Sequence, residues 1–251
     1  MTVTFIILSA LFGLVVGSFL NVCIDRLPAK KSLAYPPSHC DACQKPLKIQ
    51  DLIPVVSYLW LRGKCRYCGM KIPQRVLWVE VFSGAVFAFL FWRYGLSWEF
   101  PLTAFYSSVL LVLAMIDLRH NLILNVVVYP TAIIALIIGF FLPDFDVFKG
   151  ALGGAIGFSI LLIPALVMRK GMGWGDVKMA ALIGLMLGFP IVFVGLFLGI
   201  LLGGIFAALL LLFRKKSRKD TIPFGPWLAL GAFIALIYGK EILDWYLTVF
   251  S

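Results

Sequence analysis

The sequence contains few charged residues. They make up 14% of its 251 residues, whereas hydrophobic residues make up 62%. A soluble globular domain typically has about 25% charged and about 45–50% apolar residues. The composition therefore excludes a chain that folds mainly in water. It predicts an all-α polytopic membrane protein, because each run of roughly 20 apolar residues can cross the bilayer as a helix.

The N-terminal segment has no basic residue before Arg26. A cleavable signal peptide starts with a positively charged region ahead of its apolar core, so we expect the run 3–23 to remain as the first transmembrane helix. The other apolar runs predict seven further spans, with a break at Pro190 because proline ends a helix. These spans are expected near 76–94, 99–117, 126–142, 150–168, 178–189, 190–213 and 226–248.

Acidic residues are also scarce: 12 Asp and Glu stand against 22 Lys and Arg, which gives a net charge of +10. Taken alone, this charge would suit nucleic-acid binding. However, 19 of the 22 basic residues fall in four segments that share one side of the bilayer if the N-terminus lies outside. Loops rich in Lys and Arg face the cytoplasm, so the charge indicates topology, and we expect no nucleic-acid partner. The four segments are 24–75, 118–125, 169–178 and 214–225.

The one long polar stretch, 24–75, holds two CxxC pairs, Cys40 with Cys43 and Cys65 with Cys68. Two such pairs are typical of a tetrahedral Zn²⁺ site that stabilises a small fold. Two disulfides are a competing interpretation, which the reducing cytoplasm disfavours. A redox role for one pair is a third. We predict structural zinc at all four cysteines.

These observations divide the chain into three parts. Residues 1–23 are expected to form the first transmembrane helix, 24–75 a cytoplasmic zinc-binding loop domain, and 76–251 a transmembrane bundle. The complete prediction is about eight transmembrane helices with one small loop domain, surrounded by a lipid bilayer. The sequence leaves the oligomeric state open.

Three acidic residues, Glu80, Asp117 and Asp176, lie in or against apolar spans. An ionisable group within a span is costly, on the order of 3 kcal/mol at the helix centre, and is a functional candidate for that reason. Asp117 could instead be an interfacial residue paired with Arg119 or Lys178. Glu80 could pair with a basic residue of the adjoining loop or line a polar pocket.

Asp176 follows Gly171, Gly173 and Gly175. Such glycines let the backbone approach another helix or an extended substrate, although Asp176 could equally cap the helix that follows. Asp117 and Asp176 are predicted at the same face of the bilayer, on different spans, where they could meet. Two carboxyls that share a site retain one proton between them. The ionised member can activate water while the protonated member polarises a peptide carbonyl, which is aspartic peptidase chemistry.

At these residues the chain resembles the bacterial type 4 prepilin peptidases, which are GxGD aspartic peptidases. The matching motifs run through the chain in the order of that family. Some positions depart, such as Leu124, where the family usually has proline. The matching stretches are Gly17-Ser18-Phe19-Leu20-Asn21-Val22, Arg26-Leu27-Pro28, the two CxxC pairs, Asp117, Gly173-Trp174-Gly175-Asp176 and Pro223-Phe224-Gly225-Pro226.

The resemblance implies an enzyme of the bacterial inner membrane that removes the basic leader of type IV prepilins and pseudopilins. It implies catalytic roles for Asp117 and Asp176, with Gly173, Gly175 and Lys178 supporting the active site. It also implies methylation of the new N-terminal residue by S-adenosylmethionine, although no glycine-rich methyltransferase fingerprint is present and no residue can be assigned to the methyl donor. The alternatives are a GxGD peptidase without methyl transfer, a proton or cation transporter, and a membrane protein that docks a soluble partner.

Overall fold

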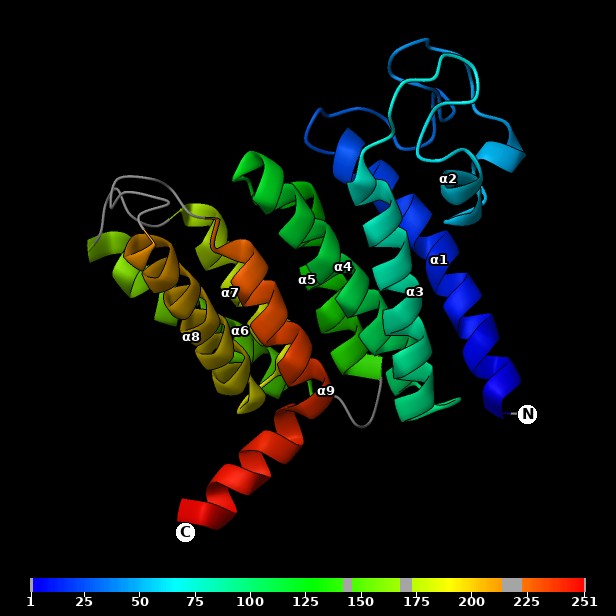
Figure 1. Ribbon diagram of the computed structural model, residues 1–251. Coiled ribbons are helices and arrows are strands. Elements are labelled where there is room, and N and C mark those ends of the chain that lie inside the picture. The colour runs from blue at the N-terminus through cyan, green and yellow to red at the C-terminus, as the bar shows by residue number, and fades with distance from the viewer. Residues whose placement is uncertain (1, 142–145, 168–172, 214–222, 251) are drawn as a thin grey trace. The chain divides into compact units, whose positions relative to one another are not determined.

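The computed structural model describes residues 2–141, 146–167, 173–213 and 223–250. Within these ranges the chain is helical apart from loops and two isolated β-bridges. Figure 1 labels the α-helices in chain order. They are α1 (Thr2–Arg26), α2 (Val56–Trp60), α3 (Gln74–Tyr94), α4 (Glu99–His120), α5 (Asn125–Phe141), α6 (Val147–Val167), α7 (Trp174–Leu187), α8 (Ile191–Leu212) and α9 (Gly225–Phe250), with a 3₁₀ turn, η1 (Ile49–Asp51), before α2.

The prediction of an all-helical membrane protein is confirmed, and each expected span coincides with a helix. Six of these helices are long and apolar enough to cross a membrane: α1, α3, α4, α6, α8 and α9. The other two, α5 with 17 residues and α7 with 14, are close in length to the expected runs 126–142 and 178–189. Both are shorter than the roughly 20 residues of a typical membrane span. The predicted basic segments 169–178 and 214–225 fall partly on 168–172 and 214–222, which lie outside the described residues.

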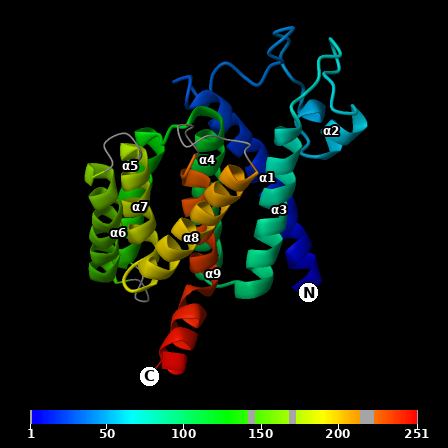
Figure 2. The same cartoon turned by 60° about the vertical axis from the view of Figure 1, so that its left-hand side comes forward.

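The chain divides into two compact units, Met1–Ser108 and Val109–Ser251. In the first unit, α1 and α3 lie side by side and antiparallel, as Figures 1 and 2 both show. Every fourth residue of one α1 face is small or polar: Ser9, Gly13, Gly17 and Asn21 are all buried. This spacing lets the two backbones approach closely, as small residues do between membrane helices.

Hydrogen bonds fix the register of α1 against α3 at both ends of this face. The Ser9 hydroxyl donates to the Phe87 carbonyl at 2.9 Å, and the Asn21 side-chain amide donates to the Val76 carbonyl at 3.0 Å. Between them, a methyl group on Gly17 would lie 2.8 Å from Cα of Glu80. The contact therefore depends on the absence of a side chain at Gly17.

In the second unit, α7 contacts α5, α6, α8 and α9. Half of its residues are buried, among them Val177, Ala180 and Ile183. A helix enclosed by other helices needs an apolar surface on most sides, which explains why the sequence of α7 resembles a membrane span although it is only about 21 Å long. Gly188 ends the helix with a φ of +70°, a conformation that favours glycine.

Candidate active site and metal centre

Asp117 lies in the last turn of α4 and is buried. Its Oδ2 accepts a hydrogen bond of 2.9 Å from the backbone N–H of Gly225, the first residue of α9. Gly225 is close-packed here, since a methyl group on it would lie 2.8 Å from the same oxygen. The start of α9 thus fixes the orientation of the Asp117 carboxyl.

Asp176 lies in the first turn of α7 and belongs to the same compact unit as Asp117. The two carboxyl groups are close enough to interact electrostatically. Ile123, in the loop between α4 and α5, lies beside Gly175, which precedes Asp176, and beside Gly225, which binds Asp117. A methyl group on Gly175 would lie 2.9 Å from Cβ of Ile123, and one on Gly225 would lie 3.1 Å from its Cδ1. The structure therefore brings the two predicted aspartates into one neighbourhood around Ile123.

The close contacts between α6 and α7 locate Asp176 along the bundle. Gly153 faces Gly184 and Gly157 faces Ala180, so these antiparallel helices pass each other in a fixed register. Continuing that register by one turn places Asp176 at the level of Leu161, about 9 Å from the α6 end at Val167 at 1.5 Å per residue. Asp176 is therefore recessed relative to the end of α6, although it lies in the first turn of its own helix α7.

The three residues predicted to support the active site have separate surroundings. Gly173 is the N-cap of α7, and its carbonyl accepts the Asp176 N–H at 3.1 Å. Gly175 packs on Ile123, as described. Lys178 donates to Oδ1 of Asn125 at 3.1 Å, and its ammonium lies 5.8 Å from the ring centre of Tyr129. Lys178 thus joins α7 to α5, and its supporting role stays a prediction.

The four loop cysteines form a cluster in the first unit. All four sulfur atoms lie within 4.8 Å of one another, and Sγ of Cys40 is 3.8 Å from Sγ of Cys68. A tetrahedron with Zn–S bonds of about 2.3 Å has sulfur–sulfur edges of about 3.8 Å. The donor set and its size therefore fit one tetrahedral metal ion.

The two CxxC segments adopt the same backbone turn. In the first, Cys40 N–H donates to the Lys45 carbonyl and Gln44 N–H donates to the Cys40 carbonyl. The second segment has the same two bonds: Cys65 N–H donates to the Met70 carbonyl, and Gly69 N–H donates to the Cys65 carbonyl. Backbone N–H groups of Tyr67 and Cys68 also lower the pKa of Cys65 to about 7. These N–H groups favour the thiolate of Cys65, which is the form that binds metal.

Sequence reasoning missed the residue that ties the second cysteine turn to the rest of the loop. Asp51 Oδ1 accepts Nε of Arg66 at 2.6 Å, and Oδ2 accepts the Tyr67 hydroxyl and the Lys48 N–H, both at 3.1 Å. The Asp51 side chain is only 3% exposed. Burial alone would raise the pKa of Asp51, but these hydrogen bonds outweigh it and lower that pKa.

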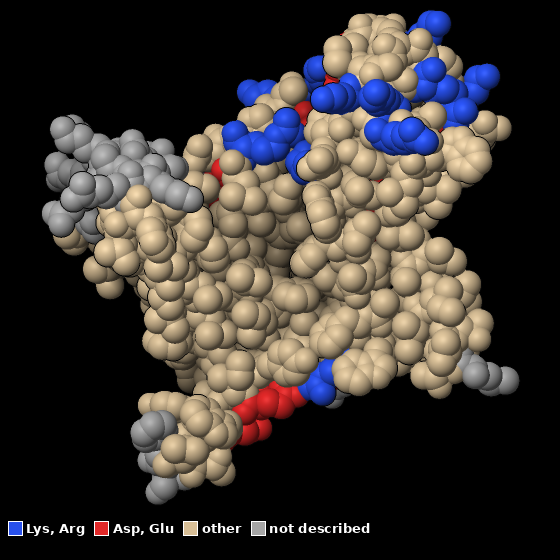
Figure 3. All heavy atoms as spheres, in the orientation of Figure 1, with Lys and Arg blue, Asp and Glu red and all other residues tan. Residues whose placement is uncertain are grey.

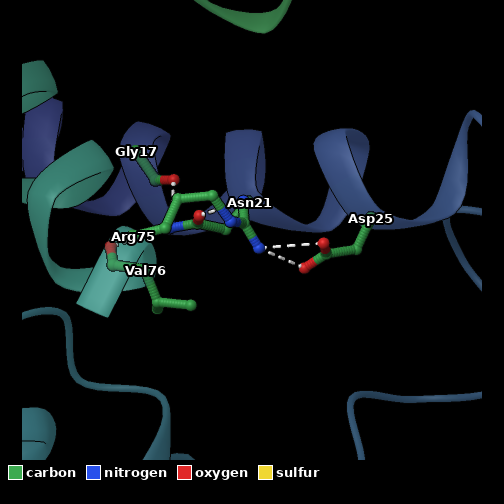
Figure 4. Close-up of polar contacts among 5 residues, drawn as sticks. All are labelled: Gly17, Asn21, Asp25, Arg75 and Val76. Atoms are coloured by element: carbon green, nitrogen blue, oxygen red, sulfur yellow. Dashed lines mark hydrogen bonds and ion pairs between the residues drawn. The ribbon is translucent and has the colours of Figure 1, made fainter. Parts of the chain in front are cut away.

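A second polar network joins α1 to the start of α3 (Figure 4). Arg75 donates to Oδ1 of Asn21 at 3.0 Å and to both carboxylate oxygens of Asp25, at 2.8 and 2.7 Å. One and a half turns further along α3, the buried Glu80 accepts the N–H of Val55 at 2.7 Å. The Arg75 network therefore joins α1 to α3, while Glu80 fastens the loop to α3 by bonding to loop backbone rather than to a basic side chain.

The fold and these two sites define a polytopic membrane protein with two neighbouring carboxyl groups and a four-cysteine cluster that could hold a metal ion. Residues 11–94 match the bacterial peptidase A24 N-terminal domain, and residues 104–208 match the type IV leader peptidase family. Curated relatives match over nearly the whole chain. This chain belongs to the type IV leader peptidase family, as the resemblance predicted.

Three relatives illustrate the similarity, and each is named prepilin leader peptidase/N-methyltransferase. The protein from Bacillus subtilis (strain 168) is 33% identical, with 94% of this chain and 96% of the relative covered. The Stutzerimonas stutzeri protein is 32% identical, with 97% and 94% covered. The Pseudomonas aeruginosa PAO1 protein is 33% identical, with 97% and 93% covered. No solved structure matches the chain significantly.

Proposed function

We propose that this chain removes the basic leader of type IV prepilins and pseudopilins and methylates the N-terminal amine that cleavage exposes. The observation that supports peptide cleavage is the neighbourhood of Asp117 and Asp176, two carboxyl groups at the ends of α4 and α7. The support for methyl transfer is membership of a family whose relatives carry the name N-methyltransferase.

Asp117 and Asp176 are the proposed catalytic residues. Two neighbouring carboxyl groups hold one proton between them. The ionised carboxyl takes a proton from water while the protonated one donates a hydrogen bond to the scissile carbonyl. Water oxygen then adds to the carbonyl carbon, the amide C–N bond breaks, and the departing nitrogen takes up a proton. The hydrogen bond from Gly225 leaves one oxygen of Asp117 available for this exchange.

The recessed position of Asp176 suits a substrate that is itself partly in the membrane. A prepilin leader is basic and precedes an apolar helix, so the scissile bond lies at the boundary between water and lipid. Gly173 leaves space beside the carboxyl group for an extended backbone, since a methyl group on it would meet no atom closer than Oδ2 of Asp176 at 3.6 Å. Gly175 is occupied by its contact with Ile123. Lys178, bonded to Asn125, is proposed to hold α7 and α5 together at this level.

We propose that a zinc ion is bound by the thiolates of Cys40, Cys43, Cys65 and Cys68. The ion would stabilise the fold and take no part in the reaction, because four thiolates leave no open coordination position. Residues 24–75 are the proposed cytoplasmic zinc-binding domain, between the first helix 1–23 and the bundle 76–251. We propose the bacterial inner membrane as the location, with the N-terminus outside and both the zinc loop and the aspartates on the cytoplasmic side, because 19 of 22 basic residues would then lie inside.

The test is mass spectrometry of a prepilin incubated with the purified protein and S-adenosylmethionine. The proposal expects a product that lacks its leader and carries one added methyl group. Cleavage without methylation would leave the peptidase and remove the methyltransferase. No cleavage of any of several prepilins by folded, zinc-loaded protein would contradict the proposed function and favour a transporter.

A further inference from the structure

The segment from η1 through α2 exposes a group of large apolar side chains that the proposed reactions do not use. Ile49 is 85% exposed, Val56 58%, Leu59 62% and Trp60 81%. We call these four residues the apolar cluster. A soluble surface rarely gathers such residues, and a contiguous exposed apolar patch marks an interaction site.

The single turn of α2 has two different faces. Tyr58 points toward the loop, where its hydroxyl donates to the Ile72 carbonyl at 3.4 Å and its ring would lie 2.9 Å from a methyl group on Gly63. Val56, Leu59 and Trp60 point away from it and remain exposed. One face of α2 is therefore occupied by the protein, and the other is available to a partner.

The contact between Glu80 and Val55 sets the depth of α2 beside the membrane-spanning α3. Val55, which directly precedes α2, donates its N–H to Oε2 of Glu80 at 2.7 Å. Glu80 lies six residues after Gln74, the first residue of α3, and so about 9 Å along the helix. Amphipathic membrane-surface helices bury their apolar face about 5–10 Å into the boundary between headgroups and acyl chains. The chain thus folds back and brings the start of α2 to the level of Glu80, which corresponds to that depth when the first residue of α3 lies at the membrane surface.

The segment that carries the apolar cluster is rich in basic residues. The segment 24–75 holds ten Lys and Arg and three Asp, and two of these Asp, Asp25 and Asp51, are paired with Arg75 and Arg66. Figure 3 shows Lys and Arg side chains gathered over this loop. Lys48, Arg62 and Lys64 flank η1 and α2 directly. Basic residues beside an inserted apolar face are attracted to anionic lipid headgroups.

We infer that the apolar cluster is a membrane-surface anchor that inserts into the leaflet on the loop side, while Lys48, Arg62 and Lys64 bind anionic lipid headgroups. This inference goes beyond the proposed enzymatic reactions and does not depend on them. The anchor positions the metal-binding loop against the bilayer, in addition to its attachment at Glu80. A basic prepilin leader is a poorer occupant, because the surrounding charge has the same sign.

The test uses the full-length, zinc-loaded protein in vesicles of phosphatidylcholine, with or without phosphatidylglycerol. The fluorescence difference between wild type and Trp60→Phe isolates the contribution of Trp60. We expect lipids brominated near the headgroup end of the acyl chain to quench this contribution several-fold more than aqueous acrylamide does. We expect stronger lipid quenching with phosphatidylglycerol, and a decrease toward the phosphatidylcholine value at high salt, because salt screens the headgroup charges.

A triple variant, Lys48→Gln, Arg62→Gln and Lys64→Gln, should lose the dependence on phosphatidylglycerol. Its prepilin cleavage rate and zinc content show whether it is folded, and the salt titration of the wild type provides the same test if it is not. Quenching of Trp60 by acrylamide but not by brominated lipid would overturn the inference. Lipid quenching that is independent of phosphatidylglycerol and salt would overturn the recognition of anionic headgroups. Protection that appears only when prepilin is added would assign the surface to the substrate instead.

Discussion

Replacement of Gly225 by alanine tests the proposed active site without removing either carboxyl group. The added methyl group would lie 2.8 Å from Oδ2 and 3.1 Å from Cγ of Asp117. Carbon atoms pack at about 3.5–4.0 Å from one another, so the Asp117 carboxyl has to move by roughly 0.5 Å. Catalytic groups must be held to within about 0.5 Å, and a 1 Å displacement can cost about 10²-fold in rate. We therefore expect Gly225→Ala to reduce kcat for prepilin cleavage by about tenfold to a hundredfold.

The matched control is Gly204→Ala, since no atom lies within 4 Å of a methyl group at that position. Initial rates of leader removal at saturating prepilin would be compared for both variants and the wild type in the same detergent, together with their melting temperatures. Gly204→Ala should keep its cleavage rate. A Gly225→Ala enzyme within about twofold of the wild type, with the same melting temperature, would refute the proposed role of the contact between Gly225 and Asp117.

Three further predictions concern packing and the metal centre. Gly184→Val should lower the melting temperature and slow cleavage, because the new side chain would collide with the Gly153 backbone. Such overpacking costs about 1–3 kcal/mol of stability. The control variant Gly204→Val should change neither the melting temperature nor the cleavage rate. Cys68→Ser should abolish zinc binding, measured by elemental analysis, and make residues 24–75 sensitive to protease. A chelator should have the same effect on the wild type. Equal protease resistance of the wild type, the chelated wild type and the variant would contradict a structural metal. Asp51→Asn should weaken zinc binding by about tenfold, since groups that orient metal-binding segments typically contribute that much; unchanged affinity in a competition titration would show that the Arg66 contact is not needed.

The sequence predicted the features that depend on local pattern. Apolar runs predicted the helices, and CxxC spacing predicted four cysteines that the fold does cluster. The predicted start was wrong at α7, which begins at Trp174 rather than near 178. Its apolar surface contacts other helices. The proximity of Asp117 and Asp176 was anticipated only from their shared side of the bilayer, whereas the level of Asp176 beside α6 depends on the register of α6 against α7.

The contacts that fasten the loop could not be predicted. No role was predicted for Asp51, and its contact with Arg66 spans 15 residues of irregular chain. The acceptor for Val55 is Glu80, 25 residues later and on a different element. Such contacts follow from the three-dimensional path of the loop. In contrast, the recurrence of Ser9, Gly13, Gly17 and Asn21 at intervals of four was a readable signal for the α1–α3 contact.

The most direct test of the central claim is the effect of Asp117→Asn and Asp176→Asn on two separate reactions. Each variant would be given an intact prepilin, and then a peptide that already lacks the leader, together with S-adenosylmethionine. The account predicts that each variant loses at least a thousandfold in leader cleavage, while methylation of the pre-cleaved peptide continues. Leader cleavage within about tenfold of the wild type in either variant would contradict the assignment of the two aspartates as the catalytic pair.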